Sequence, residues 1–149
     1  MGLDCSHDAF HGAYSAFNRF RQAVAAAIGG SFPPHYLYEN GNLVEGGDGF
    51  LKKRADLSER CLYWGDECSP EANPGLYIFF VHEDCEGEIS PADCTLVANE
   101  LEAILPKIAA LGWHEAGHIA ARGGLVGVTE KFIAGCRAAA ADGVPLEFH

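Results

Sequence analysis

A chain of 149 residues, with 48% hydrophobic and 21% charged residues, has the size and composition of one globular domain. Its formal net charge of -11 argues against the basic surface on which non-specific nucleic-acid binding depends. The sequence opens without a basic and apolar leader, and its apolar runs are too short to cross a bilayer. We therefore expect a cytoplasmic protein without nucleic-acid or membrane partners, whose six cysteines are free thiols.

The first predicted element is a helix over residues 12–27. Its apolar side chains recur at helical spacing and are Tyr14, Phe17, Phe20, Val24 and Ile28. The pair Gly29-Gly30 ends the pattern. From residue 31 to residue 74, prolines and glycines interrupt any periodicity, so we expect loops with short strands around 35–38 and 61–64.

Residues 76–81 form a continuous run of aromatic and β-branched side chains, which predicts a strand buried on both faces. Ser90-Pro91-Ala92-Asp93 then predicts a helix start, with Ser90 as N-cap and Pro91 at the first helical position. Pro106 should kink this helix or begin a second one.

A last helix is predicted over residues 129–141, with Gly143 as its stop. The tail 144–149 alternates and can add a short edge strand or pack against the body. This order of elements indicates an α+β fold, one domain over residues 1–149, in which about three helices cover a small sheet.

Reactive side chains are concentrated in three segments, 4–11, 82–88 and 114–118. The first precedes the first helix, where Asp8 and His11 are candidate caps. A capping role leaves Asp4 and His7 unexplained, so this segment is a candidate ligand site. The second follows the predicted strand and precedes a helix, a position that favours ligand binding. Its candidate ligand groups are His82, Asp84 and Glu88.

Aromatic and basic residues near the first helix suggest what such a ligand contains. Tyr14 and Trp64 are candidates to stack on a base, and Arg19, Arg21 and His11 are candidates to contact phosphate. A large aromatic is more often part of the core, which is the competing interpretation for Trp64.

The third segment, His114-Glu115-Ala116-Gly117-His118, matches H-E-x-x-H. On a helix, the two histidines would bind one zinc ion and the glutamate would deprotonate its water. The neighbouring glycines Gly112 and Gly117 disfavour such a helix, and the sequence selects no third ligand. A polar loop between two helices is the alternative, in which His118 still lines a ligand site.

Several motifs resemble a set of small uncharacterised proteins of bacteriophages and prophages. They are Met1-Gly2-Leu3-Asp4-x-Ser6-His7, His11-Gly12-Ala13-Tyr14-Ser15-Ala16-Phe17-x-Arg19, His82-x-Asp84-Cys85-x-Gly87-Glu88-Ile89, Gly117-His118-Ile119 and segments of 132–149. The resemblance covers most of the chain outside 31–73. It implies a phage setting and carries no activity with it, and its recurring part near residue 117 is the glycine–histidine pair.

We therefore expect a phage-type ligand-binding protein rather than an enzyme, with no cofactor. In the bacterial host cytoplasm it would sequester a small nucleotide-derived signal of the immune response. Two alternatives remain from the residues. One is a zinc-dependent hydrolase using His114, Glu115 and His118, and the other is an acidic inhibitor that binds a defence protein directly. The sequence leaves self-association open.

Overall fold

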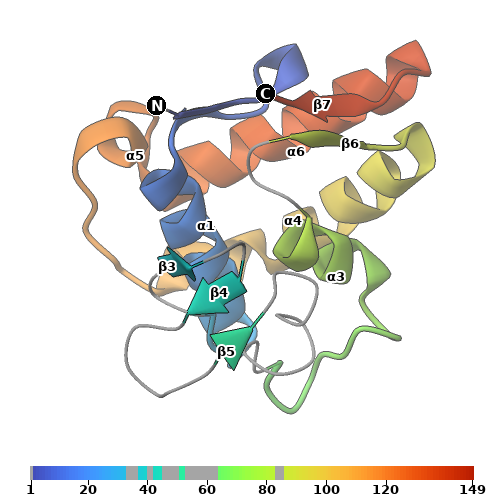
Figure 1. Ribbon diagram of the computed structural model, residues 1–149. Helices are drawn as coiled ribbons and strands as arrows, with labels where there is room; N and C mark the ends of the chain where they lie inside the picture. The colour runs from blue at the N-terminus through green and yellow to red at the C-terminus, as the bar shows by residue number, and fades with distance from the viewer. Residues whose placement is uncertain (1, 33–36, 40–41, 45–50, 53–63, 83–85) are drawn as a thin grey trace.

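The computed structural model describes residues 2–32, 37–39, 42–44, 51–52, 64–82 and 86–149. It confirms the α+β fold, with helices packed against short antiparallel strands (Figure 1). The helices are α1 (Tyr14–Ala27), α3 (Pro74–Val81), α4 (Pro91–Ala110), α5 (Gly117–Ala121) and α6 (Gly124–Asp142). The strands are β1 (Gly2–Asp4), β2 (His11–Ala13), β3 (Leu37–Glu39), β4 (Asn42–Val44), β5 (Leu51–Lys52), β6 (Gly87–Ile89) and β7 (Leu146–Phe148).

The first and last strands of the chain are joined by backbone hydrogen bonds. β1 pairs antiparallel with β2, and β6 pairs antiparallel with β7. A bridge between Cys5 and Phe148 connects the two pairs, and Asp4 and His149 exchange N–H···O bonds of 3.0 and 2.8 Å. The predicted strand in the tail is therefore present, but it is not at an edge, because β6 pairs with one side of it and the chain around β1 bonds to the other. Figure 1 shows these strands together beside α6, with the two chain ends close to each other.

A separate three-stranded antiparallel sheet has the order β3-β4-β5. The strand predicted around residues 35–38 overlaps β3, which begins at Leu37. Residues 33–36 and 61–63 lie outside the described part of the chain, and so does most of the strand predicted around 61–64.

Helix α1 confirms the predicted helix, with Phe17, Phe20 and Val24 fully buried. Its N-cap is Ala13, without a side-chain cap, so the expectation that Asp8 or His11 caps this helix is wrong. Phe17 and Phe20 meet Phe79 and Phe132 with ring centroids 4.9–6.0 Å apart, mostly edge to face. These rings connect α1, α3 and α6 in one core, the arrangement that aromatic quadrupoles favour.

The strand predicted over residues 76–81 is wrong, because this run forms helix α3. In a short run of apolar residues with no polar residue between them, periodicity does not distinguish a buried strand from a buried helix. Pro74 occupies the first turn, where its missing N–H costs nothing. The Glu100 carboxylate accepts the N–H groups of Gly75 and Leu76 at 2.7 and 3.1 Å. A distant side chain on α4 thus supplies the cap that the local sequence lacks.

Helix α4 begins as predicted, with the Ser90 hydroxyl accepting the Asp93 N–H at 3.2 Å. It continues through Pro106 to Ala110, so the expectation of a second helix starting at this proline is wrong. Helix α6 begins five residues before the predicted start, at Gly124, and ends at the predicted Gly143 in the left-handed region. The glycines at 124 and 127 conceal this first turn from a propensity argument.

At Gly135, α6 comes close to the segment that follows η1 (Ser6–Asp8), the turn between β1 and β2. A β-carbon at this position would collide with the side chain and backbone of Ala9. We expect Gly135→Ala to lower the free energy of unfolding by about 1 kcal/mol or more, although alanine favours a helix by about 1 kcal/mol. Urea denaturation measures this change, and an unchanged or higher midpoint would contradict the close approach.

The buried thiols should make the protein sensitive to alkaline pH. Burial raises the pKa of Cys5 to about 12, and a hydrogen bond with Cys94 together with burial raises that of Cys136. In the unfolded chain these thiols ionise from about pH 9, so the unfolded state then binds fewer protons than the folded one. The contribution of these thiols to the free energy of unfolding is fully present below this pH. Above it, the free energy of unfolding falls by up to about 1.4 kcal/mol per pH unit for each thiol. Cys5→Ala should flatten the slope measured between pH 9 and 11, whereas parallel curves would refute the assignment.

Candidate functional site

The segment 4–11 forms the end of a β-hairpin, with η1 between its strands. His7 and Asp8 both adopt left-handed backbone angles, with φ of 57° and 55°. Two consecutive residues with side chains in this region are uncommon and cost free energy, although Asp and His tolerate it better than most. The surrounding contacts must therefore hold this turn in place.

Side chains of the turn bind to helix α6 and strand β7. His7 Nε2 lies 3.2 Å from the Asp142 carboxylate, and Lys131 Nζ donates to Asp8 at 2.6 Å. The Ser6 hydroxyl accepts the backbone N–H of Glu147 at 2.9 Å. His7, predicted to bind a ligand, is thus engaged in fixing the turn.

Asp8 lies among several cationic groups. Its pKa is lowered first by the hydrogen bond and charge of Lys131, and further by the charges of Arg122 and His11. Its side chain is 69% exposed, so the pair that it forms with Lys131 lies at the surface.

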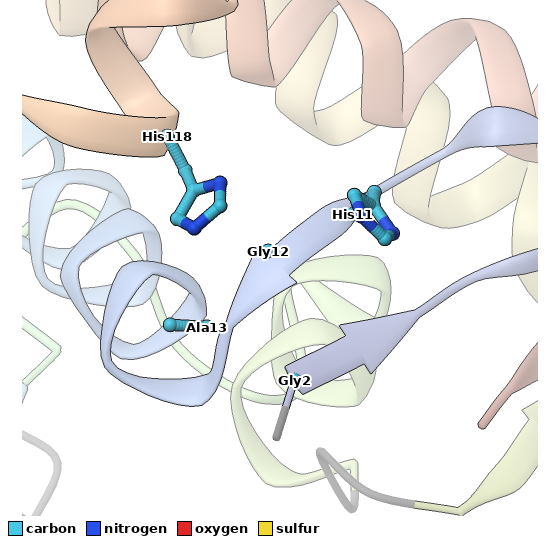
Figure 2. Close-up of a pocket in the computed structure, with 5 residues that line it drawn as sticks. All are labelled: Gly2, His11, Gly12, Ala13 and His118. Atoms are coloured by element: carbon cyan, nitrogen blue, oxygen red, sulfur yellow. The ribbon is translucent and has the colours of Figure 1, made fainter.

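A hollow of about 250 Å³ lies beside this region, between strand β2 and helix α5. It is lined by Gly2, His11, Gly12, Ala13 and His118. In Figure 2 the imidazole of His118 projects from α5 toward β2, and His11 lies beyond Gly12 on the strand. A β-carbon on Gly12 would lie 3.4 Å from the His118 side chain, so a bulkier side chain there would enter the hollow.

The structure therefore brings together two of the predicted ligand-binding histidines, His11 and His118, from segments more than 100 residues apart. Both are exposed at the surface. His11 also lies opposite Asp4 across β1 and β2, with Nδ1 3.4 Å from a carboxylate oxygen. Asp4 is thus placed to orient the imidazole of His11 at the edge of the hollow.

Arg19 and Glu115 form an ion pair that no local pattern indicated. Arg19 Nε donates to Glu115 at 2.7 Å, and its guanidinium lies 4.1 Å from the centre of the Trp113 ring. The Glu115 side chain is only 12% exposed, and that of Arg19 is 39% exposed. This contact fixes the segment before α5 against α1, and so positions His118.

Arg21 is fully buried, although the sequence suggested a phosphate contact. It donates to the carbonyls of Phe79 and His82, at the C-terminal end of α3, and lies over the Phe17 ring. A cation is favourable at the negative end of a helix, and two carbonyls and a ring face replace its hydration. This position gives Arg21 a role inside the core, away from the hollow.

The remaining predicted ligand residues that the structure describes do not line the hollow. His82 contacts the Phe148 ring with centroids 4.2 Å apart, and its Nε2 donates to the Glu88 carbonyl at 3.1 Å. Glu88 is exposed on β6, opposite Glu147. Trp64 is buried against Phe80, and Tyr14 is partly buried against the core. Asp84 lies outside the described residues.

The H-E-x-x-H segment does not form one helix. Helix α5 begins only at Gly117, which has a φ of 63°, so His114 and His118 are not one turn apart on a shared helix. Glu115 is occupied by Arg19. Within the described residues, no three His, Cys, Asp or Glu side chains lie close enough to hold a metal ion.

Arg122 is the functional candidate that sequence reasoning missed. It caps the C-terminal end of α5, four residues after His118. The other Lys and Arg side chains that the structure describes donate to a carboxylate or a carbonyl: Arg19, Arg21, Lys107, Lys131 and Arg137. Across the described chain, Arg122 alone among them has no bonded side-chain partner. The only sequence signal was its place directly before the Gly123-Gly124 pair.

If Glu115 serves the ion pair with Arg19, its substitution should lower the stability of the protein, an effect that a purely catalytic glutamate would not have. We expect Glu115→Gln to lower the free energy of unfolding by about 1 kcal/mol, because Arg19 loses a half-buried carboxylate partner. Arg19→Gln and the double variant complete a thermodynamic cycle, in which the two losses should not add. Glu130→Gln, at an exposed position on α6, is the control. Additive losses would contradict the pair.

No helix in the described residues is long and apolar enough to span a membrane. Comparison with protein-family models, with curated proteins and with solved structures gives no match to this chain. The case for a function therefore rests on the hollow between β2 and α5, on its two histidines and on the cationic groups beside it.

Proposed function

We propose that this protein binds a small phosphate-bearing, nucleotide-like ligand at the hollow between β2 and α5. The observation that carries this proposal is the meeting of His11 and His118 in one hollow. Arg122 follows α5 four positions after His118, and its side chain has no bonded partner among the described residues. Imidazole N–H groups and a guanidinium are donors suited to phosphate oxygens.

The size of the hollow limits what it can hold. Ligand pockets usually enclose about 300–1,000 Å³, and this one measures about 250 Å³. It therefore accommodates one part of a small ligand, such as a phosphate with its sugar, while the rest lies along the surface.

Binding without conversion is the activity that these residues support best. Among the described side chains, Glu115 is held by Arg19, and His7 is held by Asp142. The resemblance to phage proteins adds a setting to the proposal, in which the ligand is a nucleotide-derived immune signal of the host and the protein sequesters it. The hypothesis of an acidic inhibitor stays a prediction.

Calorimetry of the full chain against cyclic nucleotides and ADP-ribose derivatives tests this function. We expect heat and a rise in melting temperature with at least one of them, and about tenfold weaker binding for His118→Ala, since one charge-assisted contact is worth about 1.4 kcal/mol or more. His114→Ala, at an exposed neighbouring position outside the hollow, is the matched control.

The bound compound should be recovered chemically intact after release, as chromatography can establish. No heat and no thermal shift with any member of the panel would remove the proposed function. Recovery of a cleaved compound would replace binding by catalysis.

A further inference from the structure

Lys131 is already paired with a carboxylate of the N-terminal hairpin. Lys131 on α6 donates to Asp8 at 2.6 Å, and Asp8 belongs to the turn with two left-handed residues. Its carboxylate is 69% exposed. An exposed ion pair of this kind contributes little to stability, because water screens and competes for both charges. A dissolved anion can therefore replace Asp8 on Lys131 at small cost.

Arg122 follows the last residue of α5, four positions after His118, which lines the hollow. A β-carbon on Gly127 of α6 would collide with the carbonyl oxygen of Arg122, and Lys131 follows Gly127 by one helical turn, so Arg122 packs on α6 one turn away from Lys131. Arg122, His11 and Lys131 all act on the Asp8 carboxylate through their charges. Arg122 follows α5, His11 lies on β2 and Lys131 lies on α6, and of these three Lys131 is the one that donates a hydrogen bond to Asp8.

We propose that Arg122 and Lys131 anchor the phosphate of the ligand, and that Asp8 holds this position in the free protein until phosphate displaces it. The inference rests on the proposed function and deepens it, because it names the anchoring residues and the group that competes with the ligand. A phosphate monoester carries about -1.5 to -2 charges at pH 7 and three acceptor oxygens. It thus satisfies both cations better than one carboxylate does.

The arrangement differs from what the sequence suggested. Arg19 and Arg21, the predicted phosphate contacts, donate to Glu115 and to the carbonyls of Phe79 and His82. Arg122 keeps its donors available within the described structure, and Lys131 needs only to exchange one anion for another. The ligand class that fits is a phosphate or diphosphate with a small sugar-sized group in the hollow.

Inorganic pyrophosphate is the probe, titrated calorimetrically into the full chain at fixed ionic strength. Asp8→Asn removes the competing charge, and asparagine suits a left-handed position at least as well as aspartate. We expect this variant to bind pyrophosphate about tenfold more tightly, and Arg122→Gln and Lys131→Met to bind about tenfold more weakly. Lys107→Met and Arg137→Gln remove cations paired elsewhere, with Glu67 and Glu102, and should leave binding unchanged.

Asp8→Asn is expected to strengthen pyrophosphate binding, whereas Arg122→Gln and Lys131→Met are expected to weaken it. A general effect on folding would not give changes of opposite sign, and circular dichroism of each variant monitors folding directly. Weaker or equal binding by Asp8→Asn would overturn the displacement. If Lys107→Met weakens pyrophosphate binding as much as Arg122→Gln does, the effect is one of net charge and the anchor is wrong. The anchor is also wrong if neither the wild type nor Asp8→Asn gives heat with pyrophosphate.

The two proposals can fail separately. If a nucleotide binds in a manner that depends on His118 but not on Arg122, Lys131 or Asp8, the proposed function stands and the anchor is wrong. If pyrophosphate binds with the expected signs while no member of the nucleotide panel binds, the anchor stands and the nucleotide-like ligand is wrong.

Discussion

The hydrogen bonds between the backbones of Asp4 and His149 join the first strand of the chain to the last, and the candidate site depends on them. Strands of three residues make few bonds, and an isolated two-stranded hairpin is marginal in water. The pairing with β7 and β6 gives β1 a stable neighbour, and β1 in turn sets the register of β2. The hollow exists where it does because β2 is held at that place against α5.

The polar residues of the N-terminal segment have unequal roles within this framework. Ser6 and His7 bind α6 and β7 and hold a strained turn, and Gly135 lets that turn approach α6 closely. Asp8 makes an exposed contact with Lys131, and both charges of this pair are open to water. A strained turn with one dispensable contact is where a ligand can act at small energetic cost. The same segment thus combines structural support with a group that competes for the proposed site.

The sequence predicted those parts of the fold that depend on neighbouring residues. Ser90 caps α4 and Gly143 ends α6, because capping involves only groups within one turn. The apolar run 76–81 was wrongly predicted to be a strand. It is a helix because the Glu100 carboxylate accepts the N–H groups of its first turn and because its rings pack in the aromatic core. The two glycines near the start of α6 hid its first turn for a related reason, because packing overrides their low helix propensity.

The sequence by itself determined the α+β class, the long helices and the segments that hold the reactive side chains. Only the tertiary structure decided which of these side chains meet. It placed His11 with His118, gave Glu115 to Arg19, and put Arg21 at the end of α3 inside the core. The physical reason is that ion pairs and hollows form between residues about 100 positions apart, and periodicity and motif spacing carry no information about such distances.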